Sequence, residues 1–198
     1  MTDFTLVSAA LRERGYTVQV FASGAEAAVY LNETIDGKTV GIGGSSTVKD
    51  LGIYDLLQSH NTVIWHWMQD PASARKQAMQ TQIYLTSANA LAQTGELINI
   101  DGAGNRVSST LFGHEKVYYL IGRNKLTETY EQAVWRARNV AAPQRAKQLG
   151  AKTPCAAKAE RCFDCKSPGR ICRGLVTLWG PMLSMDAEVL LIDEDLGL

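Results

Sequence analysis

Hydrophobic residues along this chain follow two spacings, one typical of amphipathic helices and one typical of buried strands. Helical spacing covers residues 3–14, 23–32, 48–58, 71–80 and 128–140, with a further turn or helix at 143–149. Short β-prone runs lie at residues 16–21, 39–42, 61–67, 83–86, 116–121, 175–179 and 188–192. Because strands and helices alternate, the pattern predicts an α/β fold whose mostly parallel sheet carries helices on both faces.

Two helix starts carry capping signals. Ser23, with Glu26 three residues later, is expected to begin the helix at 23–32. Thr127 is expected to cap the helix at 128–140 in the same way.

An unusually polar stretch runs from Thr86 to Val107, directly after the predicted strand at 83–86. Residues 96–101 alternate as a second strand would, and Asp101 to Asn105 is rich in turn-forming residues. We expect residues 106–111 to return as the other arm of a β-hairpin. The stretch carries more hydrogen-bonding groups than a plain core segment needs, which favours a pocket wall over a solvated hairpin.

A glycine-rich turn follows the strand at 39–42. Its residues, Gly43, Gly44, Ser45, Ser46 and Thr47, lead into a helix, so free backbone N–H groups and hydroxyls gather at one point. This arrangement predicts a seat for an anion, and the alternative is a tight turn that binds nothing. The turn lacks the third glycine of a dinucleotide fingerprint and the Gly-Lys-Ser/Thr of a Walker loop.

Several side chains of the polar stretches are candidates for ligand binding or catalysis. Glu96 and Asp101 are the acids, and Lys125 follows the strand at 116–121 at the sheet edge where α/β proteins bind ligands. We expect these three as acid, base or nucleophile. The ligand-binding candidates beside the glycine-rich turn are Ser87, Asn89, Asn105 and Arg106.

Composition excludes some classes of protein. The 198 residues contain 20 basic and 20 acidic side chains, so the excess positive charge of a nucleic-acid-binding protein is absent. No apolar run approaches the length of a membrane span, and the first residues lack the apolar core of a secretion signal. We therefore expect a cytoplasmic protein with no nucleic-acid partner.

All four cysteines of the chain lie within one short polar segment. Cys155, Cys162, Cys165 and Cys172 are separated by six, two and six residues. Such a segment buries too little apolar surface to fold unaided, which favours a metal held by four thiolates. Zinc and an iron–sulfur cluster remain open, and two disulfides are the non-metal alternative, which a reducing cytoplasm disfavours. The chain thus divides into an α/β domain at 1–150, a cysteine-rich loop at 151–174, and strands at 175–198 that return to the domain.

Four segments of the chain carry a resemblance to a known family. Residues 40–52, 86–91, 94–106 and 122–125 resemble the LUD-domain proteins of the lactate-utilisation protein C type. The cysteine motif resembles that of the family's short branch. The resemblance implies a fold like that of ribose-5-phosphate isomerase, glucosamine-6-phosphate deaminase and the coenzyme A transferases, in which the glycine-rich turn binds phosphate or an acyl carboxylate. It also implies a role in lactate oxidation beside iron–sulfur partner proteins.

Three functions are compatible with these observations. The first is a component of L-lactate oxidation that binds a small anionic metabolite, a carboxylate or phosphate, between the glycine-rich turn and the polar hairpin. The second is a stand-alone sugar-phosphate isomerase or acyl transferase with a structural zinc, in which Glu96 is base or nucleophile. The third is a non-catalytic scaffold that docks a partner through its cysteines.

Overall fold

A six-stranded sheet in which all neighbouring strands are parallel forms the centre of the molecule. The computed structural model describes residues 2–158 and 160–198. The strand order is β1-β10-β7-β4-β2-β3, and the strands are β1 (Thr17–Phe21), β2 (Thr39–Ile42), β3 (Thr62–Trp65), β4 (Ile83–Thr86), β7 (Lys116–Gly122) and β10 (Asp186–Ile192). The predicted parallel α/β fold is therefore confirmed.

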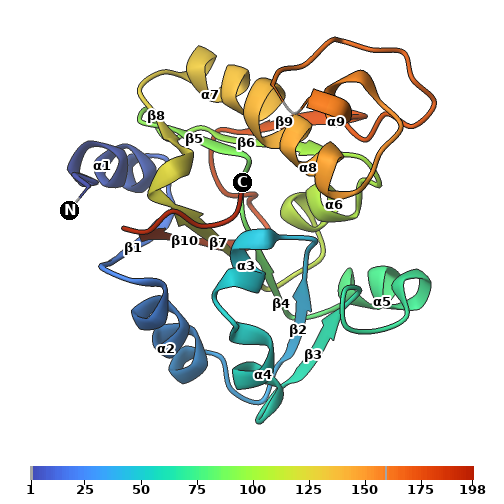
Figure 1. Ribbon diagram of the computed structural model, residues 1–198. Helices are drawn as coiled ribbons and strands as arrows, with labels where there is room; N and C mark the ends of the chain where they lie inside the picture. Colours follow the sequence, from blue (N-terminus) through green and yellow to red (C-terminus); the bar gives the residue numbers. More distant parts are fainter. Residues whose placement is uncertain (1, 159) are drawn as a thin grey trace.

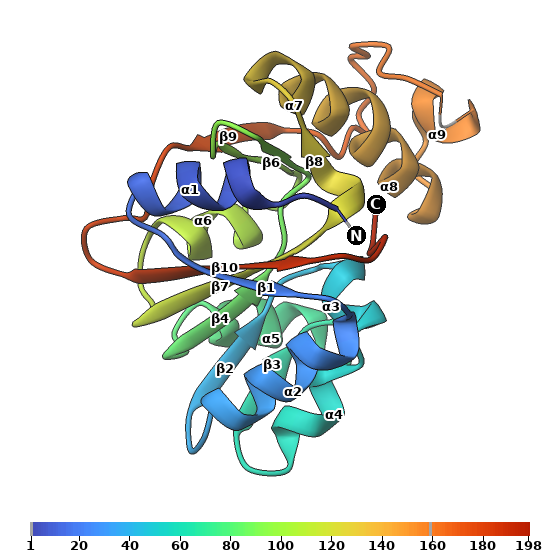
Figure 2. The ribbon, with the colours of Figure 1, turned by 90° about the vertical axis from the view of Figure 1, so that its left-hand side faces the viewer.

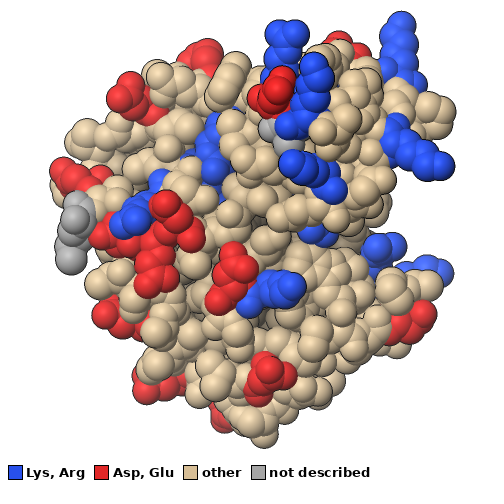
Figure 3. All heavy atoms as spheres, in the orientation of Figure 1, with Lys and Arg blue, Asp and Glu red and all other residues tan. Residues whose placement is uncertain are grey.

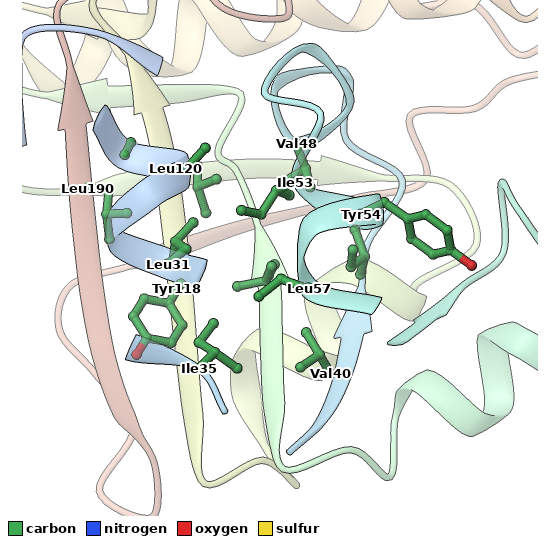
Figure 4. Close-up of a cluster of buried hydrophobic side chains, with 14 of the residues drawn as sticks. Leu31, Ile35, Val40, Val48, Ile53, Tyr54, Leu57, Tyr118, Leu120 and Leu190 are labelled. Carbon is green, nitrogen blue, oxygen red and sulfur yellow. The ribbon is translucent and has the colours of Figure 1, made fainter. Parts of the chain in front are cut away.

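One face of this sheet is covered by helices. They are α2 (Gly24–Thr34), α3 (Ser46–Asp50) and α4 (Ile53–Gln58), of which α2 and α4 lie near the bottom of Figure 1. Their apolar side chains meet those of the strands in a continuous core, in which Leu31, Ile53 and Leu57 are fully buried. Figure 4 shows them pointing toward Val40 of β2 and Leu120 of β7. Ser23 caps α2 as predicted, accepting a hydrogen bond from the Glu26 N–H at 3.2 Å.

The other face carries helices and a second sheet that the sequence pattern did not reveal. Helices α1 (Thr5–Glu13) and α6 (Asn105–Leu111) lie between the large sheet and the small one in Figure 2. The small sheet has the order β8-β5-β6-β9, with strands β5 (Ala90–Ala92), β6 (Leu97–Asp101), β8 (Leu126–Thr127) and β9 (Gly174–Leu178). Leu91, Leu97 and Leu178 from the small sheet pack in one core with Val117 and Tyr119 of β7.

A last layer covers the outer side of the small sheet. It begins with α7 (Tyr130–Arg136), passes through a π-helical turn at Ala137–Ala141 and continues as α8 (Ala142–Gln148). The remaining helices are α5 (Pro71–Ala78), which packs against β2 and β3, and α9 (Pro154–Lys158). The π-helical turn places Pro143, which has no N–H to donate, in the first turn of α8, where no donor is needed.

The predicted hairpin arm at 106–111 is wrong, because these residues form α6. The Asp101 carboxylate accepts hydrogen bonds from the backbone N–H groups of Arg106 and Val107 at 3.0 and 3.1 Å. An acceptor at this end of a helix satisfies N–H groups that have no partner within the helix. Strand β6 pairs instead with β5 and β9, antiparallel to both.

Two helix boundaries also differ from the prediction. The expected helix at 48–58 is interrupted at Gly52, whose φ of +64° is left-handed and ends α3 before α4 begins. The cap of α7 is Thr129 rather than Thr127, because Thr127 pairs with Ala92 in the small sheet. Thr129 accepts from the Gln132 N–H at 3.2 Å and completes a capping box with the Gln132 side chain.

The strands after the cysteine segment serve both sheets. Strand β9 forms an edge of the small sheet, and β10 lies in the large sheet between β1 and β7. None of the helices in the described residues is long and apolar enough to cross a membrane.

A buried ion pair fixes β10 to its neighbour β7. Glu188 is 1% exposed, and its carboxylate lies 2.6 Å from Lys116 Nζ and accepts a hydrogen bond from the Tyr30 hydroxyl at 2.6 Å. Both partners compensate the removal of the carboxylate from water.

We expect Lys116→Met to lower the free energy of unfolding by about 3–5 kcal/mol, because Glu188 would remain buried without its cation. Lys38→Met is the matched control: Lys38 pairs with Glu115 at 3.3 Å on the exposed surface, where a pair contributes about 0–1 kcal/mol. Urea unfolding at pH 7 measures both. Equal losses for the two variants would contradict the importance of the buried pair.

Candidate functional site

A cavity of about 630 Å³ lies where three neighbouring strands of the large sheet end. Strands β2, β4 and β7 lead directly into the segments 43–47, 87–89 and 123–125. Residues from all three of these segments line the cavity, and residues 100–106 form a fourth part of its wall. The two predicted polar stretches therefore meet, at the sheet edge where parallel α/β folds bind ligands.

Lys125 joins the three strand ends. Its side chain is only 3% exposed. Its Nζ donates to Thr47 Oγ1 at 2.6 Å, to Ser87 Oγ at 2.9 Å and to the Ala88 carbonyl at 3.2 Å. Among the described residues it forms no ion pair. Burial, reinforced by the charges of Arg136 and Arg106, lowers the pKa of Lys125 to about 7.

Arg106 supplies a second cation to the cavity wall. Its guanidinium donates to Asn99 Oδ1 at 2.7 Å, to Asn89 Oδ1 at 3.3 Å and to the Ile100 carbonyl at 2.5 Å. All these partners are neutral, so the hydrogen bonds fix the position of the guanidinium without cancelling its charge. Asn89, predicted as a ligand-binding residue, thus positions Arg106 as well as lining the cavity.

The Asp101 carboxylate holds the loop that surrounds it. Oδ1 accepts from the N–H groups of Ala103 and Gly104 at 3.1 Å each, and Oδ2 accepts from those of Arg106 and Val107. Four N–H donors occupy the lone pairs that a carboxylate offers. Asp101 lines the cavity as predicted, but this geometry gives it a structural task and does not favour the predicted acid or base role.

The opposite wall of the cavity is built from side chains that sequence reasoning missed. Arg75 of α5 and Arg145 of α8 line it together with His66 and Trp67. Arg145 lies over the Trp67 ring, with 4.9 Å between Cζ and the ring centroid. Nothing in the sequence pattern placed α5 and α8 at the same opening.

His66 is the one imidazole on this wall. It is 8% exposed, and its Nδ1 has no hydrogen-bond partner among the described residues. Burial lowers the pKa of His66, and the charges of Arg75 and Arg145 lower it further. Both causes favour the neutral form of the ring.

The cations outnumber the acids around the cavity. Among the described residues six cationic side chains line it, against Asp101 as the single acidic side chain: Arg75, Arg106, Lys125, Arg145, Arg170 and Arg173. In Figure 3 lysine and arginine side chains gather at the upper right, over α8, α9 and the loop that follows them. A chain with balanced total charge thus has a strongly positive cavity.

Glu96 does not line this cavity. Its carboxylate forms an ion pair with Arg14 and accepts from the Thr94 hydroxyl, and Arg14 also donates to the Trp179 carbonyl. The structure thus separates Glu96 from the glycine-rich turn, and the expectation that both enclose one ligand is not met. Arg123 also lies outside the cavity and pairs with Asp193 and Asp195.

The other predicted binding residues are split between the lining and its support. Gly44, Ser45, Ser46, Ser87 and Asn105 line the cavity. Gly43 and Thr47 lie behind it. A Cβ on Gly43 would approach the Tyr84 hydroxyl to 2.8 Å, and the fully buried Thr47 holds Lys125.

The four cysteines are free thiols, each partly exposed. Their thiol chemistry suits zinc or an iron–sulfur cluster. Their arrangement does not yet fit a metal, because in residues 2–158 and 160–198 no three His, Cys, Asp or Glu side chains come together as ligands. The choice of metal stays a prediction, which metal analysis and the ultraviolet–visible spectrum of anaerobically purified protein would test.

Comparisons with known proteins bear on the fold and the family. The LUD domain family model matches residues 5–191. A crystal structure of a DUF162 family protein from Deinococcus radiodurans is similar, with a TM-score of 0.54 and 12% identity. The alignment covers 97% of this chain and 99% of that one. Among curated proteins, none matches this chain.

The low pKa of Lys125 predicts how stability depends on pH. Between pH 7 and 10.5 the unfolded state binds more protons than the folded state, so stability rises with pH in this window. From pH 7 to pH 9 we expect a gain on the order of 2 kcal/mol from this group. Lys125→Met should remove that gain.

Urea midpoints of both proteins at pH 7, 8 and 9 measure the effect. Comparison with the variant cancels the contributions of other groups that titrate in this range. Parallel curves for the two proteins would show that Lys125 stays protonated in the fold.

Proposed function

Because the chain belongs to the LUD domain family, which is associated with lactate utilisation, we propose that it is a component of L-lactate oxidation that binds a small carboxylate or phosphate in the cavity. Lys125 carries the proposal. A buried amine surrounded by neutral acceptors and further cations gains a compensating charge when an anion enters.

The cavity offers an anion both charge and hydrogen bonds. Arg106 and Lys125 lie among the strand ends, and Arg75 and Arg145 lie on the opposite wall. The Ser46 hydroxyl and the Asn105 side-chain amide line the cavity with no protein partner among the described residues, so both can bind the ligand. Guanidinium groups bind carboxylates and phosphates equally well, so the lining does not distinguish between these two classes of ligand.

The same geometry weakens the reading of a stand-alone isomerase or acyl transferase. Glu96, the expected base or nucleophile, is tied to Arg14, and the Asp101 oxygens are occupied by N–H groups. Among the described residues that line the cavity, His66 supplies the imidazole, and burial lowers its pKa from the ordinary value. We therefore propose anion binding as the activity of this chain, with His66 as the group that exchanges a proton with the ligand.

The partners we expect are the iron–sulfur proteins of lactate oxidation. This expectation rests on the family alone. It is tested by co-purification of the tagged chain from cells grown on lactate, against cells grown without it.

We expect L-lactate or inorganic phosphate to bind the protein and raise its melting temperature, and we expect Arg75→Ser to weaken that binding at least tenfold. Arg75 forms no hydrogen bond or ion pair among the described residues, so its loss leaves the fold intact. Arg123→Ser is the control, because Arg123 lies in surface ion pairs outside the cavity. Isothermal titration calorimetry reads the affinities. Equal affinities for both variants would contradict the cavity as the binding site.

Growth of cells on lactate is a second test of the same two variants. In cells that lack the native copy, the Arg75→Ser protein should support lactate-dependent growth poorly and the Arg123→Ser protein should support it fully. Normal growth with both would separate the cavity from lactate utilisation.

Anion binding should also take up a proton. A bound anion raises the pKa of Lys125 from about 7, so affinity falls as pH rises from 7 to 9. Sulfate is the suitable probe, because it does not titrate in this range. Calorimetry in two buffers of different ionisation enthalpy counts the protons. Lys125→Met should bind sulfate more weakly and without proton uptake, and the same uptake in the variant would assign it to another group.

A further inference from the structure

The amine of Lys125 lies in the surroundings that make a lysine nucleophilic. The side chain is 3% exposed, and its three hydrogen-bond partners are all neutral. Two of them, Ser87 and Ala88, line the cavity together with Lys125. Burial and neighbouring cations lower the pKa of this amine to about 7, so a large share of it is unprotonated at neutral pH. Desolvation and a nearby cation are the two means by which proteins activate a lysine for attack on a carbonyl carbon.

The hydrogen bonds around Nζ also fit the unprotonated amine. The ammonium form donates to all three partners, whereas the free amine has two hydrogens and one electron pair. The Thr47 hydroxyl donates to the Leu196 carbonyl at 3.3 Å and can therefore accept from Nζ, and the Ala88 carbonyl can only accept. The electron pair then faces Ser87 Oγ, 2.9 Å away on the cavity side. Rotation of the Ser87 side chain about its Cα–Cβ bond opens this direction to a ligand.

A second cation lies beside the same serine. Arg106 Nη1 donates to the Ser87 carbonyl at 3.3 Å, so Arg106 and Lys125 both contact Ser87. A guanidinium binds a carboxylate in a fixed orientation. In a 2-oxo acid the carboxylate is bonded directly to the carbonyl carbon, so the carboxylate bound at Arg106 brings that carbon toward Lys125. In a 2-hydroxy acid the same carbon is tetrahedral and offers no carbonyl to the amine.

We propose that Lys125 forms a Schiff base with a 2-oxo acid, the chemical class that oxidation of a 2-hydroxy acid produces. This step rests on the proposed anion cavity, because the carboxylate of the oxo acid binds there. The electron pair of the amine attacks the carbonyl carbon and forms a carbon–nitrogen bond. The carbonyl oxygen takes up two protons, one from the amine and one from solvent, and leaves as water. No oxidant or reductant is consumed, and the protonated imine keeps a positive charge beside the carboxylate.

Reductive trapping tests this step. The full-length protein is incubated at pH 8 with pyruvate and sodium cyanoborohydride, and mass spectrometry of the intact chain measures the product. We expect one adduct per chain, heavier by the mass of pyruvate less one oxygen atom, and peptide mapping should place it on Lys125. L-lactate should give no adduct. The absence of an adduct with pyruvate, or one spread evenly over the surface lysines, overturns the proposal.

Two lysine variants identify the amine that reacts. Lys125→Met should lose the adduct. Lys38→Met is the control and should keep it, because Lys38 pairs with Glu115 on the exposed surface, outside the cavity. An adduct of equal yield in both variants overturns the assignment to Lys125.

Two arginine variants test the cavity while Lys125 stays in place with its hydrogen bonds. At a pyruvate concentration below saturation, Arg75→Ser should slow trapping at least about tenfold, because Arg75 lines the cavity and attracts the carboxylate. Arg123→Ser should leave the rate unchanged, since Arg123 lies outside the cavity. Equal rates for the two variants would show that trapping does not depend on the cavity, which overturns the proposal.

Calorimetry distinguishes failure of the Schiff base from failure of the anion cavity. If pyruvate and L-lactate bind with similar affinity and pyruvate leaves no adduct, the anion cavity stands and the Schiff base is wrong. If pyruvate, L-lactate and sulfate all fail to bind, the anion cavity is wrong and the Schiff base falls with it.

Discussion

The hydrogen bonds of Lys125 are the interaction on which the rest of this site depends. Parallel strands must end at the same edge of the sheet, so β2, β4 and β7 deliver three separate segments to one place. Lys125 follows β7, and its Nζ donates to Thr47 Oγ1 in the segment after β2 and to Ser87 Oγ and the Ala88 carbonyl in the segment after β4. A neutral hydroxyl in its place could not supply three donors. The same amine therefore fixes the walls and adds to the positive charge that five arginines give the cavity.

How much could be predicted from sequence differs between the sheets. Strands β4, β7 and β10 of the large sheet are mainly apolar runs, and the alternation of such β-prone runs with helical patterns predicted the parallel fold. The small sheet was not predicted, because two of its strands, Ala90–Ala92 and Leu126–Thr127, are too short to show a hydrophobic period. The helix at Asn105–Leu111 was not predicted, because the carboxylate that accepts from its first N–H groups belongs to Asp101, four residues before the helix begins.

The cavity was predicted only in part from the sequence. The polar segments 44–46, 87–89 and 101–106 do line one cavity, and the convergence of strand ends explains why sequence could anticipate this. Glu96 does not line the cavity as we expected, because it lies at the opposite end of β6 from Asp101. A strand advances about 3.3 Å per residue, so the two acids lie about 16 Å apart along it, too far to contact one small ligand. Arg75 and Arg145 project from helices distant in sequence, and only the packing of α5 and α8 reveals that they share an opening with Lys125.

The charge distribution connects the stability of the fold to its ligand. Six cations repel one another around a single carboxylate, that of Asp101, whose oxygens already accept backbone hydrogen bonds. Burial further disfavours the charged form of Lys125. Such a cluster of cations lowers the stability of the fold, and the anion that we propose binds there would recover this cost by binding the folded state alone. The total charge of the chain is zero because the acids lie elsewhere: Asp193 and Asp195 are paired with Arg123, and Glu188 with Lys116. Balanced composition therefore places no limit on a local positive field, and it is this local field that we propose selects a small anion.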